Sequence, residues 1–225
     1  DGDWTSKVLD HMSDQVAIAA LPHCHWTNGA MLDLAAISGA CHAHGTALVL
    51  DVTQSLGAVP LNMKAIAPDF LICASYKWLL GPYSLGFLYI ADHHLDGSPI
   101  EENWINRKGS EDFSHLTNYR DHYQDGARRF DFGERSNPIL VPMAIAAVSQ
   151  LLDWGVDYIS SQLQLRTAEI TRKAAQFGYH SAASKRPAPH MIGLSRDGDL
   201  PHALQSRLLD DNLHVGLRGT SIRVS

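Results

Sequence analysis

Lys77 is the residue of this chain whose surroundings most clearly indicate chemistry. It stands between two apolar stretches, in the run Asp69-Phe-Leu-Ile-Cys-Ala-Ser-Tyr-Lys77-Trp-Leu-Leu-Gly81. An ammonium group in apolar surroundings loses hydration, a cost that lysines facing solvent avoid. Because burial disfavours the charged form, such an amine is suited to attack an aldehyde as a nucleophile and to form a Schiff base.

A carboxylate ends the apolar segment that precedes this lysine along the chain. Residues 47–51 read Ala-Leu-Val-Leu-Asp, and Gln54 follows three residues later. An amine for the aldehyde and an anion for the pyridine nitrogen are the two protein groups that pyridoxal phosphate requires. Asp51 and Lys77 therefore predict a site for this cofactor. The alternatives are a surface lysine at a strand end and an aspartate that only caps a turn.

Composition excludes several other classes of function. The 225 residues are 45% hydrophobic, enough for one large domain or a domain and a half. A net charge of −6 with no basic run argues against nucleic acid as a partner. The apolar stretches are too short to span a bilayer and we see no signal peptide, so we expect no membrane partner. Three cysteines without a CxxC pair make a disulfide framework improbable and favour a reducing cytoplasm.

The pattern of apolar residues predicts an α/β domain. We expect a helix over 4–12, a strand over 16–21, a helix over 32–44 that stops at Gly45, and strands over 47–51, 70–75 and 85–90. Strands that alternate with helices favour a mostly parallel sheet with helices on its faces. Ligands of such sheets bind beyond the carboxyl ends of the strands, where Asp51 and Lys77 both fall.

The second half of the chain predicts a surface excursion and a smaller unit. Residues 93–128 are polar and weakly periodic, which is typical of a long loop near a site or an interface. Helices are expected over 138–154, with Ser136 or Asn137 as N-cap, and over 157–177. A strand over 191–195, a helix over 201–211 and strands over 214–218 and 221–225 then indicate a small α+β domain. We expect the large cofactor-binding domain to cover 1–153 and an incomplete small domain to cover 154–225, in an internal piece of a longer protein.

Four groups of residues carry a resemblance to a known family. They are His44-Gly45 with Asp51-Val-Thr-Gln54, Asp69-Phe70 with Ser75-Tyr-Lys77 and Gly81-Pro82, Gly133-Glu-Arg-Ser-Asn137-Pro138, and Arg218-Gly-Thr-Ser-Ile-Arg223. In this order they resemble the class V aminotransferases, pyridoxal phosphate enzymes that include cysteine desulfurases, selenocysteine lyases and kynureninases. The resemblance covers most of the chain. It implies the three-layer, mostly parallel sheet of the aspartate aminotransferase-like large domain (fold type I), and a homodimer.

The resemblance also assigns roles around the cofactor. It implies that Lys77 forms the Schiff base and then moves a proton between the substrate Cα and the cofactor, and that Asp51 keeps the pyridine nitrogen protonated. Gln54 would donate a hydrogen bond to the cofactor's phenolic oxygen. Tyr76, where much of the family has histidine, would donate to the phosphate. Ser136 would contact the phosphate in the neighbouring subunit. A packed aromatic ring and a helix N-cap are the alternatives for these last two.

Substrate contacts follow from the same resemblance. Arg223 matches the family's carboxylate-binding arginine, whose planar fork suits an α-carboxylate, and Arg218 is the competing candidate. Trp26 and Asn28 lie on a loop where the family places groups that face the cofactor or the substrate. We expect no metal. Cys41, His42 and His44 could suggest a metal site, but residues one and two apart on a helix point in different directions.

The sequence narrows the reaction without naming the substrate. Residues 191–223 contain no cysteine, which argues against a desulfurase that forms a persulfide. Ser-Tyr-Lys77 leans toward kynureninase, but Gln54 stands where that enzyme has histidine. Transamination, β-elimination or epimerisation of an amino acid or related amine remains, with a kynureninase-like C–C hydrolase or a non-catalytic protein on the same scaffold as alternatives. We expect the 225 residues alone to bind the cofactor poorly and to be inactive, because the family's phosphate loop and ring-stacking residue lie upstream of residue 16.

Overall fold

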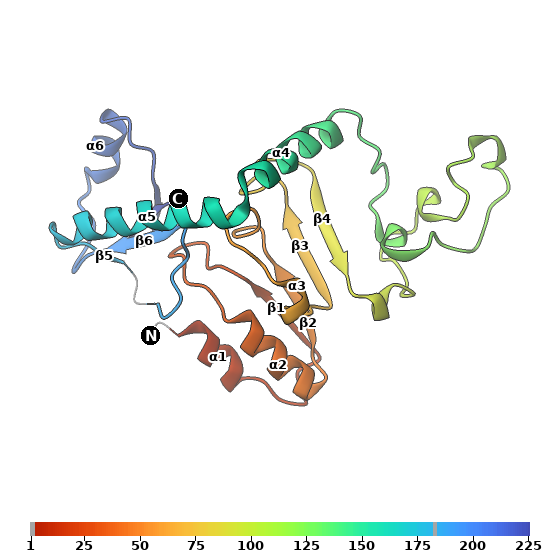
Figure 1. Ribbon diagram of the computed structural model, residues 1–225, viewed down its shortest axis with the longest axis horizontal. Coiled ribbons are helices and arrows are strands. Elements are labelled where there is room, and N and C mark those ends of the chain that lie inside the picture. The colour runs from red at the N-terminus through yellow and green to blue at the C-terminus, as the bar shows by residue number, and fades with distance from the viewer. Residues whose placement is uncertain (1–2, 182–183) are drawn as a thin grey trace.

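Two separate sheets organise the chain. The structure is a computed structural model that describes residues 3–181 and 184–225. The first sheet has the strand order β1-β2-β3-β4 and the second the order β5-β6-β8-β7. Figure 1 shows the first sheet in the middle, with the second sheet and its helices to one side and a long irregular excursion to the other.

The first sheet is mostly parallel, as predicted. Its strands are β1 (Ile18–Pro22), β2 (Ala47–Asp51), β3 (Phe70–Ala74) and β4 (Gly86–Ile90). The first three run parallel and β4 runs antiparallel to β3, so the arrows of β3 and β4 point in opposite directions in Figure 1. The carboxyl ends of β2 and β3 consequently meet at one edge of the sheet.

Helix α2 shows how the sequence fastens helices to this sheet. It covers Leu34–His44, two residues shorter at its start than predicted, because the Asp33 side chain caps it by accepting from the backbone N–H of Ala36 at 3.1 Å. Gly45 ends it in the left-handed conformation (φ 66°). Its buried residues follow the i, i+3, i+4, i+7 spacing of one helix face and are Leu34, Ile37, Ser38 and Cys41. Helix α1 (Trp4–Asp10) lies beside it, and the short α3 (Met63–Ile66) was not predicted.

The two faces of the first sheet differ. One face packs against helices and holds the main core, with the buried strand residues Ala19, Leu48, Leu50, Leu71 and Cys73. The other face is open within the described part of the chain, and Ile72 and Leu88 are each 46% exposed there. In the described residues the helices thus cover one face, where the sequence had predicted helices on both.

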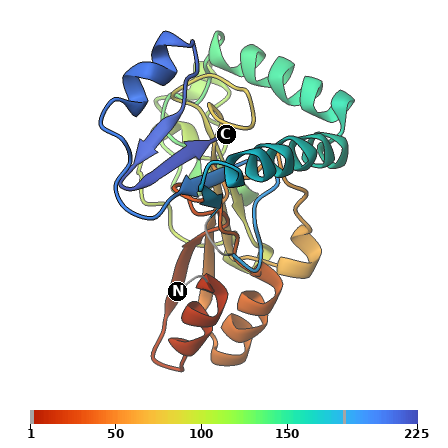
Figure 2. The ribbon, with the colours of Figure 1, turned by 90° about the vertical axis from the view of Figure 1, so that its left-hand side faces the viewer.

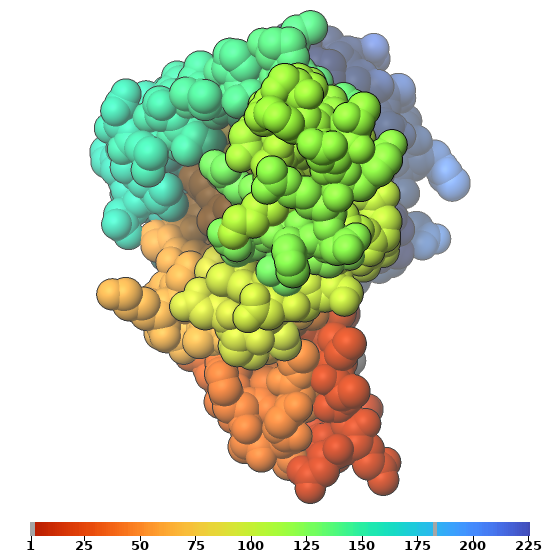
Figure 3. All heavy atoms as spheres, turned by 90° about the vertical axis from the view of Figure 1, so that its right-hand side faces the viewer, coloured from red at the N-terminus to blue at the C-terminus, as the bar shows by residue number. Residues whose placement is uncertain are grey.

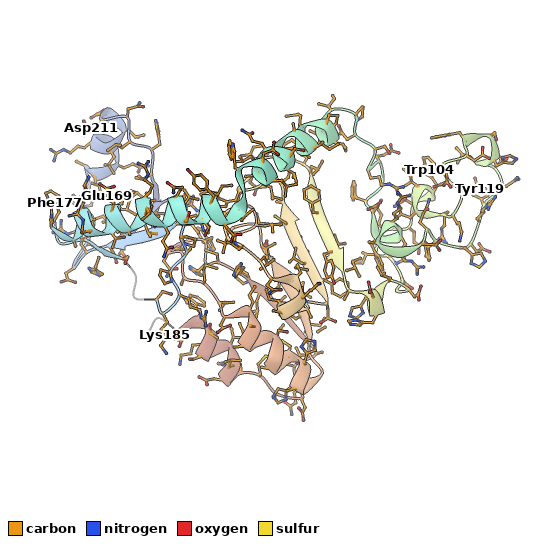
Figure 4. The ribbon with its side chains drawn as sticks, viewed as in Figure 1. Trp104, Tyr119, Glu169, Phe177, Lys185 and Asp211 are labelled. Atoms are coloured by element: carbon orange, nitrogen blue, oxygen red, sulfur yellow. The ribbon has the colours of Figure 1, made fainter. Side chains whose placement is uncertain are left out.

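The excursion predicted at 93–128 leaves the sheet after β4. Besides one isolated antiparallel bridge between Arg107 and Tyr123, it contains short 3₁₀ turns: η1 (Asp92–His94), η2 (Trp104–Asn106), η3 (Phe113–His115) and η4 (Gly126–Phe130). Figure 3 shows it as a separate lobe, and in Figure 4 the labelled Trp104 and Tyr119 lie on it, away from both sheets. Ion pairs such as Arg107 with Glu102 and Lys108 with Asp125 hold the lobe together.

Two long helices connect the excursion to the second sheet. They are α4 (Leu140–Trp154) and α5 (Val156–Ala175), which meet at a bend of 75° at Gly155 (φ 79°). The N-cap role falls to Asn137, whose Oδ1 accepts from the backbone N–H groups of Ile139 and Leu140. No single helix in the described ranges is long and apolar enough to cross a membrane; α4 and α5 meet that length and composition only as this bent pair.

The second sheet is small and antiparallel. It consists of β5 (His180–Ser181), which was not predicted, β6 (Ile192–Ser195), β7 (Gly216–Arg218) and β8 (Ser221–Val224), with α6 (Leu204–Asp210) between β6 and β7. Ile192, Leu194 and Ile222 form its own core. Figure 2 shows this unit above the helices α1 and α2. The strand–helix–strand–strand order agrees with the prediction, and the domain boundary at residue 153 stays a prediction.

Candidate active site

A cavity of about 930 Å³ opens at the carboxyl edge of the first sheet. Four residues paired across the sheet, Pro22, Asp51, Ile72 and Leu88, lie on its open face and line the cavity as one row. Trp26 and the loop 76–77 add further walls, and the excursion contributes residues 127 and 130–132. The cavity combines an apolar floor with a few charged groups, which is typical of a site for a small molecule.

Asp51 is held in place by its own loop. As the last residue of β2 its side chain is exposed to the cavity, and Oδ1 accepts from the backbone N–H of Thr53 at 2.9 Å. The hydroxyl oxygen of Thr53 in turn accepts from the backbone N–H of Ala74, at 3.0 Å, at the end of β3. Thr53 therefore ties the loop after β2 to the neighbouring strand and orients the carboxylate.

Lys77 lies in a tight loop directly after β3. The backbone N–H of Gly81 donates to the carbonyl oxygen of Ser75 at 2.8 Å, and the buried Ser75 hydroxyl donates to the carbonyl of Pro82. A Cβ on Gly81 would lie 2.8 Å from the Cβ of Ser75, so this close approach requires glycine. The loop holds Lys77 half-buried at the cavity wall, with Nζ 5.6 Å from the centre of the Tyr76 ring.

The charges of Asp51 and Lys77 act on one buried thiol between them. The pKa of Cys73 is raised to about 11, mainly by burial and then by the negative charge of Asp51, while the positive charge of Lys77 opposes the rise. Cys73 is 1% exposed and lies on β3. Both predicted groups thus lie close to the same point at the edge of the sheet.

Gln54 and Tyr76 complete the wall around these charges. Both line the cavity. Tyr76 stacks on Tyr83 with ring centres 4.5 Å apart and an angle of 13° between the planes, and it remains 38% exposed. The packed aromatic ring and the cavity-facing phenol that the sequence left as alternatives are therefore compatible.

A pair of buried histidines supports the loop from behind. Nε2–H of His190 donates to the carbonyl oxygen of Gln54 at 2.6 Å, and its ring contacts Trp78 edge-on. His23 lies 2.9 Å from the hydroxyl of Ser55 through Nδ1. The pKa of both histidines is lowered to about 4, mainly by burial and, for His23, also by repulsion from His190 when both rings are protonated. Both imidazoles are therefore neutral at physiological pH.

Two arginines of the second sheet contact Trp26, which lines the cavity, although neither arginine lines it. Nη1 of Arg223 donates to the carbonyl oxygen of Trp26 at 3.1 Å, and the guanidinium of Arg218 lies over the Trp26 ring at 5.5 Å. Within the described residues the buried Nε atoms of both arginines have no partner. Burial and then the like charge of Arg218 lower the pKa of Arg223. Two cations with free donors beside the cavity are suited to bind an anion.

Three predicted residues do not line this cavity: Asn28, Ser136 and Arg223, of which Arg223 only contacts the cavity wall at Trp26. Asn28 lines a different cavity of about 400 Å³, and its Oδ1 accepts from the backbone N–H of Ala30 at 3.0 Å in a tight turn. Ser136 is exposed and lies outside the residues that line the site. Since Ser136 was predicted to serve the neighbouring subunit, that role stays a prediction.

Sequence reasoning missed the residues that position the site. Thr53 lies inside the quoted Asp51-Val-Thr-Gln54 group, so its place next to Asp51 was the available signal. His190 had none, because it is 136 residues away from its partner Gln54 along the chain.

Comparison with known proteins places the chain in a family. The family model described as aminotransferase class V matches residues 2–218. The chain belongs to the class V aminotransferase family. It is 31% identical over 176 residues to the uncharacterised aminotransferase YcbU of Bacillus subtilis, covering 78% of this chain and 45% of that protein. It is 33% identical over 129 residues to the kynureninase of Deinococcus radiodurans, covering 56% of this chain and 30% of that one.

Solved structures of a lyase and an aminotransferase share the fold. The cystine C–S lyase C-DES in complex with cysteine persulfide matches with a TM-score of 0.79 and 22% identity over the whole chain and 60% of that protein. Alanine–glyoxylate aminotransferase from Nostoc sp. matches with a TM-score of 0.70 and 22% identity, over 93% of this chain and 56% of that protein. These matches confirm the fold type I architecture. The chain spans less than half the length of the curated relatives described above.

Pyridoxal phosphate is the cofactor of this class V chain, and the residues fit it. Another C-DES structure has glycine covalently linked to pyridoxal phosphate. In this chain a half-buried amine and an oriented carboxylate face one cavity of sufficient size. The donor set supplies the amine for an aldehyde and the anion for a pyridinium.

Proposed function

We propose that this chain is the catalytic part of a class V enzyme that acts at the α-carbon of an amino acid or a related amine, by transamination, β-elimination or epimerisation. The observation that supports the proposal is that Asp51 and Lys77 line one cavity and that both charges act on Cys73. The two groups come from neighbouring parallel strands and lie at their carboxyl ends.

The cofactor supplies an aldehyde and an electron-withdrawing ring when it is bound. In our proposal Lys77 holds the cofactor through its amine and, once free, carries a proton to and from the substrate Cα. Asp51, oriented by Thr53, pairs with the pyridine N–H. Gln54 donates from its side-chain amide to the phenolic oxygen.

The remaining predicted residues bind substrate and phosphate. Arg223 receives the α-carboxylate beside the Trp26 ring, since its Nε has no partner in the described chain and its Nη1 is already fixed on Trp26. Tyr76 donates to the cofactor phosphate. A homodimer, with Ser136 reaching the neighbouring site, and a cytoplasmic location are further parts of the proposal.

Persulfide chemistry is disfavoured by the state of the thiols. Burial raises the pKa of Cys24 to about 12 and that of Cys73 to about 11, and both thiols are 1% exposed. A nucleophilic cysteine needs a lowered pKa and access to substrate. A kynureninase-like C–C hydrolase remains the second candidate, because curated kynureninases are 27–33% identical to this chain.

The test uses the full-length protein with Lys77→Ala and, as a matched control, Lys64→Ala, a change at an exposed lysine on α3. Wild type and the control are expected to show a visible cofactor band that borohydride bleaches, with the reduced cofactor covalently attached to the peptide that contains Lys77. Lys77→Ala is expected to lose the attachment. Attachment that persists in Lys77→Ala contradicts the assignment.

Substrate class is decided by a second measurement on the wild type. Amino acids, amines and kynurenine are screened for turnover and for a shift of the visible band. Turnover of kynurenine alone selects the C–C hydrolase. A protein that binds the cofactor covalently but turns over none of the compounds supports the non-catalytic scaffold.

A further inference from the structure

A second cluster of functional side chains lies at the opposite edge of the first sheet. It consists of Asp69, which precedes β3, and of His93 and His94 in η1, which follows β4. Their ligand atoms all lie within 4.8 Å of one another, and Nε2 of each histidine is 2.8 Å from Oδ1 of Asp69. Within 3–181 and 184–225 no other group of three such side chains comes this close.

The antiparallel pairing of β3 and β4 creates this cluster. Phe70 is paired with Ile90, and the backbone N–H of Ala91 donates to the carbonyl of Asp69 at 2.9 Å. Residues 24 and 25 positions apart in the sequence therefore face each other where one strand begins and the other ends. The set considered from the sequence, Cys41, His42 and His44, does not converge, because Nδ1 of His42 faces its own helix at Ser38.

The carboxylate is oriented before any ligand binds. Oδ2 of Asp69 accepts from the backbone N–H of Leu48 at 2.7 Å, which leaves Oδ1 directed at the two imidazoles. The side chain of Asp69 is only 17% exposed. Hydrogen bonds of this kind behind a ligand are what fix metal-binding carboxylates in proteins.

The histidines are also partly fixed, and the site stays open to solvent. The ring of His94 stacks on Phe70, with centres 4.9 Å apart and 23° between the planes. The side chain of His93 is 67% exposed, so water can complete the coordination. The side chains of the adjacent Asp92 and the nearby Asp96 are not ligands in this cluster, but they add negative charge in the same short segment.

We propose that Asp69, His93 and His94 form a binding site for a divalent transition-metal ion such as Zn²⁺. Two imidazole nitrogens and one carboxylate oxygen suit Zn²⁺, Ni²⁺ or Co²⁺, whereas Ca²⁺ and Mg²⁺ prefer oxygen ligands alone. Two ligands of a tetrahedral zinc ion lie about 3.4 Å apart, so the imidazoles need to withdraw only slightly from the carboxylate.

The site is separate from the proposed active site. Asp69 binds Leu48 near the start of β2, while Asp51 ends that strand. The three residue steps from Leu48 to Asp51 span roughly 10 Å of strand. None of Asp69, His93 and His94 lines the cofactor cavity, so a metal ion here lies outside it. The role of a metal ion here is structural, because the ion links the start of β3 to the point at which the excursion leaves β4.

The test measures binding of Zn²⁺ alone to the chelator-treated full-length protein by calorimetry, with Co²⁺ as a spectroscopic probe. The double variant His93→Gln/His94→Gln is compared with a control, His202→Gln/His214→Gln, which removes two exposed histidines. Wild type and control are expected to bind Zn²⁺ at this site and to show Co²⁺ ligand-field bands. The His93/His94 variant is expected to lose one equivalent or to bind it at least about 10-fold more weakly.

Two results overturn the proposal. One is the absence of Zn²⁺ binding by the wild type, and the other is equal stoichiometry and affinity in the His93/His94 variant and the wild type. Circular dichroism checks that the variant is folded, and the single change His93→Gln, at the more exposed ligand, serves if the double variant is not. The measured Zn²⁺ binding does not depend on the cofactor. The proposed metal site therefore stands or falls separately from the proposed function.

Discussion

Nε2 of His190 lies 2.6 Å from the carbonyl oxygen of Gln54, although 136 residues separate them. Since a carbonyl can only accept, Nε2 carries the hydrogen, and Nδ1 is left as a buried atom without a partner in the described residues. The contact joins the segment that enters the second sheet to the loop that carries Asp51 and Gln54. A positioning role for His190 follows from this geometry.

Replacement of His190 tests that role. His190→Leu leaves the carbonyl of Gln54 buried without a donor and is expected to reduce the free energy of unfolding by about 1–3 kcal/mol. It is also expected to weaken cofactor retention in the full-length protein, because Gln54 lines the cavity. Urea titration and the visible cofactor band measure the two effects. The exposed control His202→Leu should change stability by less than about 0.5 kcal/mol, and equal losses in the two variants would remove His190 from this role.

Stability should fall as the pH falls from about 6.5 to about 4. The pKa of His23 and of His190 is about 4 in the folded chain, below the value of 6.5 for an unperturbed histidine. In this window the unfolded chain binds protons that the folded chain does not, so the folded state loses up to about 3 kcal/mol per histidine. Unfolding measured by urea titration at a series of pH values gives the slope. His23→Asn should flatten it, and a wild-type profile that is flat between these values would contradict the prediction.

Gly57 is expected to tolerate no side chain. Its φ is +97°, and a Cβ would lie 2.3 Å from the carbonyl oxygen of Trp78, next to Lys77. Gly57→Ala should cost about 2–4 kcal/mol of unfolding free energy. Gly39→Ala is the matched control: Gly39 lies in α2 with nothing within 4 Å of the added Cβ, so it should gain about 0.5–1 kcal/mol. Thermal unfolding of both variants measures these changes in stability. A Gly57→Ala protein as stable as the wild type contradicts the prediction.

The two arginines beside Trp26 can be separated by kinetics once a substrate is known. Arg223→Lys replaces a planar fork by a point charge and should raise KM for an amino acid about 10- to 100-fold. An amine that lacks the carboxylate should show no such change. Arg218→Lys is the comparison, since the Arg218 guanidinium lies over the ring of the same Trp26. The larger effect in Arg218→Lys would transfer the carboxylate role to that residue.

Local signals were sufficient for most elements of the fold. Gly45 ends α2 as predicted, although the cap at Asp33 was placed inside the predicted helix, and the apolar run that ends at Asp51 is the strand β2. Lys77 and Asp51 could be joined from sequence because both lie at the ends of parallel strands, whose carboxyl ends share one edge. In these cases residues close together in the sequence carry the information that predicts the element.

Contacts between distant segments were decided by the tertiary structure alone. The sequence by itself determined the family, the cofactor and the pair Asp51 and Lys77. Only the packing of the chain brought His190 to Gln54, and only the register of β3 with β4 brought His93 and His94 to Asp69. The physical reason is that strand pairing and side-chain burial depend on which surfaces of the folded chain pack together. Residues far apart in the sequence carry no local pattern that predicts this packing.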